Sequence, residues 1–482
     1  MKVAFLASEV IPFAKTGGLA DVAGALPKFL ARLGADIRVF MPLYREVRIK
    51  NLPLEPVLAG AALDLGGRQV PFSVFAHRAD GVTVFFIDQP AYFERDQLYG
   101  TPAGDYPDNA ERFAFFCRAA LETLRATGFR PDVVHGHDWQ AAAAFAYLKF
   151  VYADDPFFAR TRSLFTIHNL AYQGLFEKDV LGRIGLPESL FNMNDLEFFG
   201  KVNTLKAGIL YATGVTTVSP RYSREIQTAE FGCGLDGLLR HRAGALNGIL
   251  NGVDYRDWDP ATDRLIPRNF GPADLAGKKE CREELCRMFG LPEPADLPVA
   301  GMVTRLAGQK GLDIVCEALD SLLGLGLALV ILGTGDQKIQ DFLLAARKRH
   351  PVRIGIKIAF DERIAHTIYA GSDIFLIPSR YEPCGLAQMY AMKYGTVPVV
   401  RATGGLDDSV QEFDARAGSG NGFKFDEAAA GPFLEAVARS VRIFRRPAEW
   451  RKIVRNAMAA DFSWERSAAA YLALYEKIAA AA

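Results

Sequence analysis

The chain has 482 residues, and at roughly 100–200 residues per domain this length predicts two to four domains. Hydrophobic residues make up 50% and charged residues 23%, a balance that permits a core of native size and excludes disorder as the main state. Lys and Arg together number 56, as do Asp and Glu, so the formal net charge is zero. We therefore expect no nucleic-acid partner and no membrane partner, because nucleic acids and anionic membranes both reward an excess of basic residues.

The cysteine pattern and the apolar runs indicate a soluble, cytoplasmic protein. The six cysteines form no CxxC pair, which is typical of reduced thiols rather than of a disulfide framework. The longest uncharged apolar run, Ser321–Gly335, is interrupted by glycines and is shorter than the ~20 residues that a membrane-spanning helix needs. The apolar stretch Val3–Ser8 is followed at once by Glu9, so it is too short for the ~7–15 apolar residues of a secretory signal.

Short apolar strands alternate with amphipathic helices along the whole chain. The predicted strands are Lys2–Ala7, Asp36–Met41, Val82–Ile87, Asp132–His135, Ser163–Ile167, Val215–Val218, Pro298–Val303, Ala328–Leu332, Lys357–Ala359, Asp373–Ile377 and Val397–Val400. The first helix shows an apolar stripe spaced by three and four residues, made of Leu19, Val22, Ala23, Leu26, Phe29, Leu30 and Leu33. Nearly continuous apolar strands fit parallel sheets buried on both faces, so the predicted class is α/β, with doubly wound, Rossmann-like sheets.

The alternation of strands and helices restarts once, which predicts two large domains. The restart follows Gly248–Gly252, and the charged, Pro-containing stretch Asp257–Leu297 separates it from the next strand. We predict one domain over 1–247, a second over 248–456, and a C-terminal segment over 457–482 whose helix begins after Ser463. Two such domains whose strands end at a central cleft would bind a nucleotide-linked ligand there.

The segment Lys15–Leu19 follows the first strand and opens the first helix. Gly17 and Gly18 permit a close approach of the backbone, the helix N-terminus offers unpaired N–H groups, and Lys15 adds a full positive charge. This combination suits an anionic ligand. A tight turn with a solvated lysine explains the segment equally well, and the spacing is not that of a Walker loop.

Histidines stand at the ends of two predicted strands. His135 and His137 follow one strand, and His168 follows the next. An H-x-H pair occurs in metal sites, but no further ligand follows at the expected spacing. We therefore expect these polar side chains to line a ligand cleft rather than to hold a metal. A structural His/Asp pair that caps the following helix is the alternative.

Two further segments resemble known motifs only in part. Asp257-Trp258-Asp259 has the D-x-D pattern of a metal and nucleotide-diphosphate site, but it precedes Pro260 in a turn-rich stretch and is interpreted as a turn. Gly333–Lys338 begins like a dinucleotide-binding G-x-G-x-x-G loop, but Lys338 stands at the third glycine. The second segment is a weak fingerprint, although it is a plausible place for close backbone approach to a ligand.

Two loops of the second half carry charged side chains at strand ends. Arg305 and Lys310 follow one strand and precede a helix, a placement that suits a pyrophosphate, although a solvated loop explains it too. Glu382, in the segment Ser379–Leu386, stands where another strand runs into a helix and could accept hydrogen bonds from sugar hydroxyls. A glutamate that only neutralises the helix N-terminus is the alternative there. Thr403–Leu406 repeats this type of element after the next strand.

Taken together, these segments resemble the bacterial glycogen synthase and plant starch synthase family, family 5 of the glycosyltransferases, over the whole chain. The most specific segments are Lys15–Leu19 with Asp21, His137–Gln140, Thr166–Gly174, Asn251–Asp254, Arg305–Gly311, Glu382–Gln388 and Thr403–Leu406. The resemblance implies a GT-B fold whose C-terminal helix crosses back to the first domain. It also implies retaining transfer of glucose from ADP-glucose to the non-reducing end of an α-1,4-glucan, glycogen or a malto-oligosaccharide, with no metal and no other cofactor.

The resemblance also implies roles for individual residues, with the acceptor on the first domain and the donor on the second. The catalytic residues that it implies are Glu382, His168, Arg305 and Lys310. The substrate-binding residues are Lys15, Gly17, Gly18, Asp21, Asp138, Asn169, Asn251, Cys384, Gly385 and Leu386. Two positions depart from the pattern. Ala387 replaces the usual Thr and removes a hydroxyl near the phosphates, and Tyr390 stands where many related retaining transferases have a second Glu.

Two other functions compete with glucosyl transfer. The first is a nucleotide-dependent enzyme of another class, such as a dehydrogenase. The imperfect Gly333–Lys338 loop argues against this function. The second is a catalytically inactive glucan-binding module. Such a module would be expected to lose Lys15, Arg305, Lys310 or Glu382, and all four are present.

Overall fold

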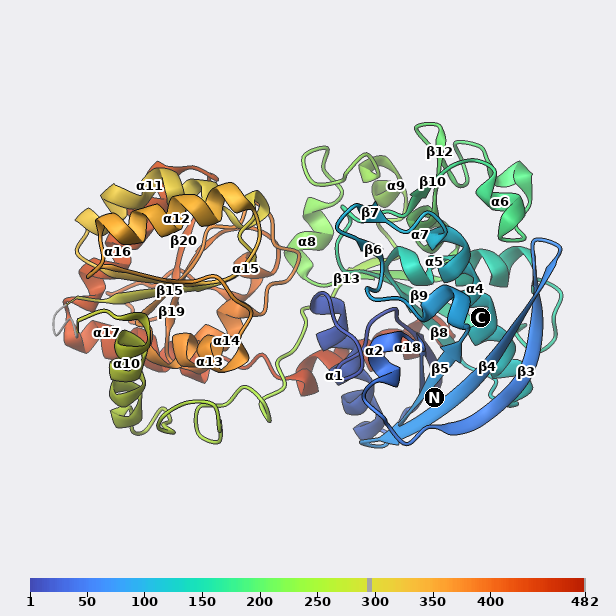
Figure 1. Cartoon of the computed structure of the whole chain (residues 1–482), viewed down its shortest axis with the longest axis horizontal. Helices are drawn as coiled ribbons and strands as arrows, with labels where there is room; N and C mark the ends of the chain where they lie inside the picture. The colour runs from blue at the N-terminus through green and yellow to red at the C-terminus, as the bar shows by residue number, and fades with distance from the viewer. Residues whose placement is uncertain (293–296, 481–482) are drawn as a thin grey trace. The chain divides into compact units, whose positions relative to one another are not determined.

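The computed structural model describes residues 1–292 and 297–480 and divides the chain into two compact units. The first unit contains Met1–Val218, Ser223–Gly252 and the chain from Trp464 onward, and the second contains Ser219–Tyr222 and Val253–Ser463. Each unit has one large sheet covered by helices on both faces (Figure 1). The predicted α/β class with two doubly wound sheets is therefore confirmed.

The sheet of the first unit has nine strands in the order β14-β13-β9-β8-β1-β2-β5-β4-β3. They are β1 (Lys2–Leu6), β2 (Asp36–Pro42), β3 (Glu55–Leu65), β4 (Arg68–Ala79), β5 (Val82–Asp88), β8 (Val133–His137), β9 (Arg162–Ile167), β13 (Gly214–Thr217) and β14 (Leu246–Gly248). All neighbours are parallel except β3 and β4, which add an antiparallel hairpin at one edge. The central strands are almost wholly apolar and buried, as strands between two helical layers must be.

The long helices of the first unit are α1 (Gly18–Arg32), α4 (Asn109–Ala126), α5 (Asp138–Phe150), α7 (Thr204–Tyr211) and α18 (Trp464–Ala480). α5 packs against α4 and α7, whereas α18 packs against α1. The C-terminal helix thus returns to the first unit, as predicted (Figure 1). The predicted apolar stripe of α1 is buried except for Leu33, which lies just past the helix end and is exposed.

Shorter elements connect the layers of the first unit. They are α2 (Arg45–Arg48), α3 (Pro90–Phe93), β6 (Gly100–Thr101), β7 (Gly104–Asp105), β10 (Leu175–Phe176), α6 (Val180–Arg183), η1 (Glu188–Leu190), β11 (Glu197–Phe198), β12 (Lys201–Asn203), α8 (Pro220–Glu225) and α9 (Asp236–His241). β10, β12 and β11 form a small separate sheet, and β6 pairs with β7. α8 spans the point at which the chain passes between the two units.

The sheet of the second unit has six parallel strands in the order β17-β16-β15-β18-β19-β20. They are β15 (Val299–Val303), β16 (Ala328–Leu332), β17 (Ile354–Lys357), β18 (Ile374–Ile377), β19 (Val397–Arg401) and β20 (Phe423–Phe425). The helical elements are α10 (Ala276–Phe289), η2 (Gly308–Lys310), α11 (Leu312–Gly324), α12 (Gln337–Arg349), α13 (Glu362–Gly371), α14 (Ala387–Lys393), α15 (Gly404–Ser409), α16 (Ala430–Phe444) and α17 (Pro447–Ala459). Figure 1 shows α11, α12 and α16 on one face of this sheet and α10, α13, α14 and α17 on the other.

The strand predictions need two kinds of correction. The predicted strand Lys357–Ala359 was placed too late, because β17 ends at Lys357. The antiparallel hairpin β3–β4 and the edge strands β14 and β20 were not predicted at all. These omissions lie at or next to sheet edges, where strands are covered less completely and their apolar signal is weaker.

Each sheet contains one point at which the strand order reverses direction. In the first sheet β1 is followed by β2 on one side, and β8 pairs with β1 on the other. In the second sheet β15 is followed by β16 on one side, and β18 pairs with it on the other. Ligands of doubly wound folds bind beyond the carboxyl ends of strands at such switch points. The loops after β1 and β8, and those after β15 and β18, are therefore where a site is expected.

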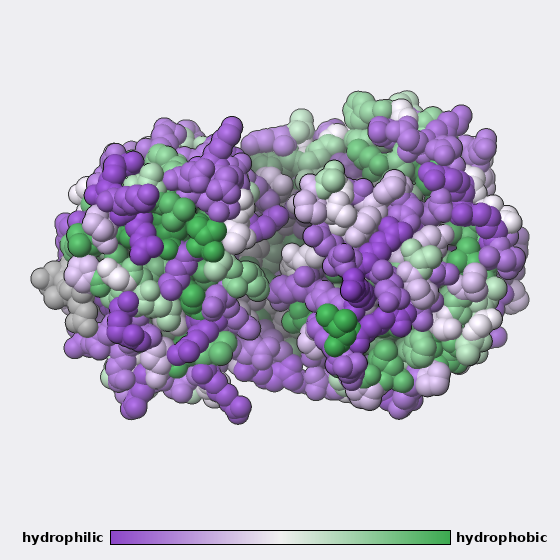
Figure 2. All heavy atoms as spheres, viewed as in Figure 1, coloured by the Kyte–Doolittle hydropathy of each residue, from purple (hydrophilic) through white to green (hydrophobic). Residues whose placement is uncertain are grey.

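The surfaces of the two units are mixed in character. On the face drawn in Figure 2, hydrophilic residues predominate and apolar residues are scattered among them. Within residues 1–292 and 297–480, no helix combines the length and the apolar content that crossing a bilayer requires.

Candidate functional site

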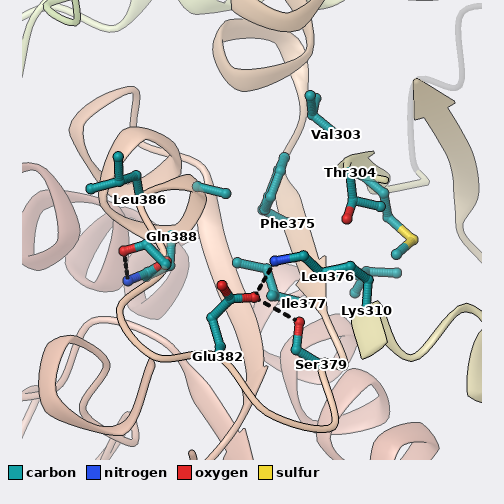
Figure 3. A pocket seen from close by; sticks show the side chains of 13 residues that line it. Val303, Thr304, Lys310, Phe375, Leu376, Ile377, Ser379, Glu382, Leu386 and Gln388 are labelled. Carbon is teal, nitrogen blue, oxygen red and sulfur yellow. Dashed lines mark hydrogen bonds and ion pairs between the residues drawn. The ribbon is translucent and has the colours of Figure 1, made fainter. Parts of the chain in front are cut away.

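A pocket of about 80 Å³ lies at the switch point of the second sheet. Its lining consists of Met302, Val303, Thr304, Lys310, Phe375, Leu376, Ile377, Ser379, Glu382, Gly385, Leu386, Ala387 and Gln388. In Figure 3 the side chains of three of these residues, Lys310, Ser379 and Glu382, point toward one another. The ammonium of Lys310 lies 2.5 Å from Oε2 of Glu382, and the Ser379 hydroxyl donates to the same oxygen at 3.1 Å.

The Lys310–Glu382 pair joins two loops that are far apart in sequence. Both side chains are largely buried, with exposed fractions of 20% for Lys310 and 10% for Glu382. A charge pair with so little water around it is stronger than a surface ion pair and more costly to break. Two of the predicted catalytic residues thus lie in direct contact, at the edge of the sheet where a ligand is expected.

A close backbone contact at Gly311 brings Lys310 to the pocket. Gly311 has a φ of 70°, and a Cβ atom there would collide with the carbonyl oxygen of Pro378, at the end of β18. Only glycine combines this left-handed conformation with such an approach. The loop after β15 can therefore lie directly on the loop after β18.

The loop from Pro383 to Leu386 leads into α14 and forms a second wall of the pocket. Gly385 and Leu386 line it, whereas Cys384 is buried next to it. Ala387, which begins α14, also lines the pocket, so a Thr at this position would add its hydroxyl there. The Thr403–Leu406 turn supports this loop from behind, because Gly405 N–H donates to the carbonyls of Glu382 and Pro383 at 3.2 and 3.1 Å.

Arg305 and the Gly333–Lys338 loop lie outside this pocket. The side chain of Arg305 is exposed, and its guanidinium donates to Gln309 at 3.4 Å, a long and weak contact. Arg305 thus keeps most of its donors available for a ligand. In the other loop, Asp336 caps α12 by accepting from Lys338 N–H at 2.8 Å, so this loop has a structural role.

In the first unit, Lys15 and Asp21 form an ion pair at the start of α1. Lys15 Nζ lies 2.7 Å from Asp21 Oδ1. Burial raises the pKa of Asp21, and the nearby Lys15 ammonium opposes this rise. Gly17 precedes the helix and Gly18 begins it, so the predicted anion-binding segment does open a helix. The cation predicted to meet a ligand is therefore already held by a carboxylate.

Asp138 connects the two predicted strand ends of the first unit. Its carboxylate accepts from the backbone N–H of His168 at 2.7 Å, and so reaches the end of β9 instead of capping its own helix. Asp138 has a φ of 54°, a strained value for a residue other than glycine and one that is common at functional sites. Asn169 follows His168, and its own Oδ1 accepts from Ala171 N–H at 3.1 Å. The structure therefore places Asp138, His168 and Asn169 together.

The three histidines at these strand ends are hydrogen-bonded to one another or to hydroxyl groups. His137 Nδ1 lies 2.9 Å from His168 Nε2, and His135 lies 2.7 Å from the hydroxyls of both Thr166 and Tyr475. In the described part of the chain, no group of three His, Cys, Asp or Glu side chains is arranged to hold a metal ion. These contacts are those expected of neutral imidazoles within a buried polar network.

Burial sets the protonation of this network. Desolvation lowers the pKa of His168 to about 3 and moves the pKa values of His135 and His137 well below their usual range. Desolvation also raises the pKa of Asp138 to about 7, although the hydrogen bonds from the backbone N–H groups of His168 and Asn169 lower this pKa. The histidines are thus neutral near pH 7, and Asp138 changes its charge there.

We expect the folded first unit to lose stability as the pH falls below 6.5. Unfolded histidines take up protons there, whereas the three buried ones do not, and each contributes a slope of up to about 1.4 kcal/mol per pH unit. Asp138 offsets the contribution of one histidine. Between pH 7 and 4 its carboxylate takes up a proton in the folded state before it does so in the unfolded state. Urea unfolding should therefore show a net loss of about 1 kcal/mol between pH 7 and 6, and of roughly 2–3 kcal/mol between pH 6 and 5.

A pair of variants checks the origin of this slope. His168→Gln should remove one histidine's share of the pH dependence, whereas His241→Gln, at an exposed position of α9, should leave the slope unchanged. An unaltered slope in the His168→Gln protein would show that this imidazole is not the group that resists protonation.

The remaining predicted residues lie near the point where the chain leaves the first unit. Asn251 is buried, and its Oδ1 meets no hydrogen-bond donor within the described residues. Such an unsatisfied acceptor is costly unless a ligand or water supplies a donor. Asp259 accepts from Ala261 N–H at 2.9 Å and pairs with Lys393 at 3.1 Å, so the D-x-D segment is a turn, as interpreted from the sequence.

Sequence reasoning missed several residues that shape these sites. Ser379 bonds to Glu382, and Thr304 and Gln388 line the pocket. Glu9, which follows β1, accepts hydrogen bonds from the Lys15–Gly18 loop. Ser379 could have been found, because it is the first polar residue after β18, but Glu9 carried no local signal that linked it to the loop.

Comparison with known proteins gives the same assignment over the full length. Residues 2–241 match the family described as the starch synthase catalytic domain, and residues 287–456 match glycosyl transferases group 1. The chain is 48% identical to the glycogen synthase of Koribacter versatilis, over 99% of this chain and 98% of that protein. It is also 48% identical to a glycogen synthase of Anaeromyxobacter dehalogenans, over 99% of this chain and all of that one.

Solved structures agree with these relatives. The catalytic domain of starch synthase IV from Arabidopsis thaliana, bound to ADP and acarbose, matches with a TM-score of 0.90 and 35% identity over 99% of both chains. A sucrose-phosphate synthase from Thermosynechococcus elongatus matches with a TM-score of 0.61 and 18% identity over the full length of both chains, and this likeness shows the fold alone. The fold is therefore GT-B, and the chain belongs to the glycogen synthase and starch synthase family of glucosyltransferases.

Proposed function

We propose that this protein transfers glucose from ADP-glucose to the non-reducing end of an α-1,4-glucan, glycogen or a malto-oligosaccharide, with retention at the anomeric carbon. The observation that carries the proposal is the buried Lys310–Glu382 pair at the switch point of the second sheet. The related starch synthase IV structure, which contains ADP and acarbose, supports a nucleotide and a glucan-like ligand for this architecture. In this proposal the second unit binds the donor, whereas the first unit binds the acceptor and contributes the anion site of its Lys15–Gly18 loop.

The residues of the second unit stabilise the departing diphosphate. Breaking the donor bond leaves new negative charge on the phosphate, so fixed positive groups accelerate the step. Arg305 can bind two phosphate oxygens at once through its guanidinium, and Lys310 acts as a point charge. The N-terminus of α14, approached through Gly385 and Leu386, adds N–H donors. Glu382 holds the sugar hydroxyls or balances the positive charge that develops on the sugar.

The residues of the first unit bind sugar and phosphate. His168, neutral and fixed through its backbone by Asp138, contacts the glucose in this proposal, and its backbone carbonyl lies beside the anomeric carbon. Asn251 offers a buried acceptor to a sugar hydroxyl. Lys15 and the N-terminus of α1 provide an anion site, and Asp21 positions the lysine. Tyr390 stands where many related transferases have a second carboxylate. In this proposal the leaving phosphate therefore acts as the base and takes the proton of the acceptor hydroxyl on the same face of the sugar.

A donor comparison tests the proposed function. The protein is incubated with a malto-oligosaccharide and either ADP-glucose or UDP-glucose, and nucleotide release and chain length are followed together. We expect ADP release matched by glucan elongation through new α-1,4 linkages, visible by NMR. Release of nucleotide without elongation, or transfer from neither donor, would refute the proposal.

We expect glucose transfer to need no divalent metal. Lys15, Arg305 and Lys310 supply three positive charges on loops that open helical elements, which is the task a bound cation performs in D-x-D transferases. Activity in excess EDTA should equal that of the untreated enzyme. Arg305→Ala should remain severely impaired after Mg²⁺ or Mn²⁺ is added. Activity that EDTA abolishes and metal restores would show that a bound cation, and not these basic side chains, neutralises the diphosphate.

We also propose that the reaction takes place in the cytoplasm. All six cysteines are free thiols, as expected of a protein that works in a reducing compartment. Cell fractionation with immunodetection checks this location.

A further inference from the structure

The carboxylate of Glu9 lies beneath the Lys15–Gly18 loop of the first unit. Glu9 follows β1 after two residues and is only 4% exposed. A buried carboxylate is costly unless hydrogen bonds or a cation compensate for the lost water. The partners of Glu9 therefore show what it is there to hold.

Three of its hydrogen bonds come from the loop itself. The backbone N–H of Thr16 donates to Oε2 at 2.5 Å, and the N–H of Gly17 donates to the same oxygen at 3.0 Å. The Thr16 hydroxyl donates to Oε1 at 2.6 Å. Bonds to an ionised acceptor are about twice as strong as neutral ones, so this carboxylate fixes the two residues that precede α1.

A tyrosine holds Glu9 from the other side. The Tyr99 hydroxyl donates to Oε1 at 2.6 Å and lies 2.8 Å from the Ser8 hydroxyl. Burial, with Glu9 next to it, raises the pKa of Tyr99 well above its usual range, so the phenol keeps its proton and remains a donor. The Glu9 carboxylate thus receives four hydrogen bonds and has little freedom to move.

The same bonds restrict where an anion can bind. The N–H groups of Thr16 and Gly17 are already used by Glu9, so a phosphate is left with the N–H groups from Gly18 onward and with Lys15. We propose that Glu9 is a positioning residue for the donor, which sets the conformation of the Lys15–Gly18 loop so that Lys15 and the N-terminus of α1 meet the diphosphate together. This inference rests on the proposed function, since it assigns the loop to ADP-glucose.

The test compares Glu9→Ala with Glu9→Gln. Alanine removes all four bonds, and we expect kcat/KM for ADP-glucose to fall about a hundredfold, since small misplacements of a binding group have effects of this size. The KM for the glucan should not change. Glutamine can still accept from the two loop N–H groups and can turn its amide nitrogen toward the hydroxyls of Thr16 and Tyr99. Its kcat/KM should stay within about tenfold of the native value.

Hydrogen exchange supplies a readout that needs no substrate. The amides of Thr16 and Gly17 should exchange faster in Glu9→Ala than in the native protein, and almost normally in Glu9→Gln. Glu55→Ala, at an exposed position at the start of β3, is the matched control and should alter neither exchange nor kinetics. Thr16→Val, which removes one of the four bonds, should give an intermediate loss of kcat/KM if Glu9→Ala does not fold.

The outcomes separate this inference from the proposed function. A folded Glu9→Ala protein with native kcat/KM would overturn the positioning role. A Glu9→Gln protein as inactive as Glu9→Ala would also overturn this role, because the negative charge of Glu9, and not its hydrogen bonds to the loop, would then be required. Altered amide exchange in Glu9→Ala, in a chain whose native form transfers no glucose from ADP-glucose, would leave the loop contact established and refute its assignment to the donor.

Discussion

Replacing Glu382 with alanine should lower kcat for glucose transfer about 10²–10³-fold, with a much smaller rise in the KM for ADP-glucose. The carboxylate lines the pocket and is fixed by Lys310 and Ser379. In the proposed reaction it balances the positive charge that develops on the sugar. An interaction that strengthens only as the bond breaks affects kcat rather than ground-state binding. Initial rates over a range of donor concentrations separate the two parameters.

The matched control for this variant is Glu435→Ala, an exposed carboxylate on α16 of the same unit. Its kinetics should equal those of the native protein. A folded Glu382→Ala enzyme with near-normal turnover would remove Glu382 from the mechanism, and a loss confined to KM would reduce it to a ligand contact.

Replacing Lys310 with alanine should lower kcat/KM for ADP-glucose by about 10³-fold. The change leaves the buried Glu382 carboxylate without its cation. In the proposed reaction it also removes a positive charge that stabilises the leaving diphosphate. Because both effects act on one pair, the double variant Lys310→Ala/Glu382→Ala should be little worse than the poorer single variant. Steady-state kinetics of the four proteins in this cycle measure the coupling.

Lys338→Ala is the control for the loss of a positive charge, since this exposed lysine lies in the first turn of α12, outside the pocket. It should keep full activity. If the losses of the two single variants simply multiplied in the double variant, Lys310 and Glu382 would be acting independently despite their contact. ADP binding by calorimetry should weaken in Lys310→Ala and remain unchanged in Lys338→Ala.

The apolar pattern was sufficient to predict most of the buried parallel strands. It was misleading at β17, where Gly355 interrupts the pattern. A Cβ atom on Gly355 would lie 2.6 Å from Cβ of Phe289, so the glycine is needed for helix α10 to approach the strand. Glycine weakens a strand prediction, and the reason for this glycine is a contact with a distant helix.

The β3–β4 hairpin was missed although its signal is present in the sequence. Val70, Phe72 and Val74 alternate with less buried residues, and Gly66–Gly67 supplies the turn between the two strands. This combination is a recognised hairpin signature. A hairpin at a sheet edge has period-two burial, so it lacks the continuous apolar run that marks a strand between two helical layers.

The individual residues of the site could be predicted from the sequence, but the contacts between them could not. Lys310 and Glu382 each stand at a strand end in the sequence, yet their contact depends on β15 and β18 being neighbours. Strand order is set by the packing of the helices between the strands, so no local pattern reveals it. Glu9 is hidden for another reason, because its hydrogen bonds to the loop depend on the way the chain turns back on itself between Val10 and Ala14, which no motif in the sequence indicates.

The return of α18 to the first unit has a consequence for how the chain folds during synthesis. Tyr471 and Tyr475 of this helix are fully buried in the core of the first unit, and Tyr475 bonds to His135. About 210 residues separate Gly252 from Trp464, so at typical rates the ribosome needs roughly 10–40 s to supply the missing helix. During that interval the nascent first unit exposes the apolar surface that α18 later covers. The second unit, whose chain is continuous apart from Ser219–Tyr222, is able to finish folding first, in reverse of the order of translation.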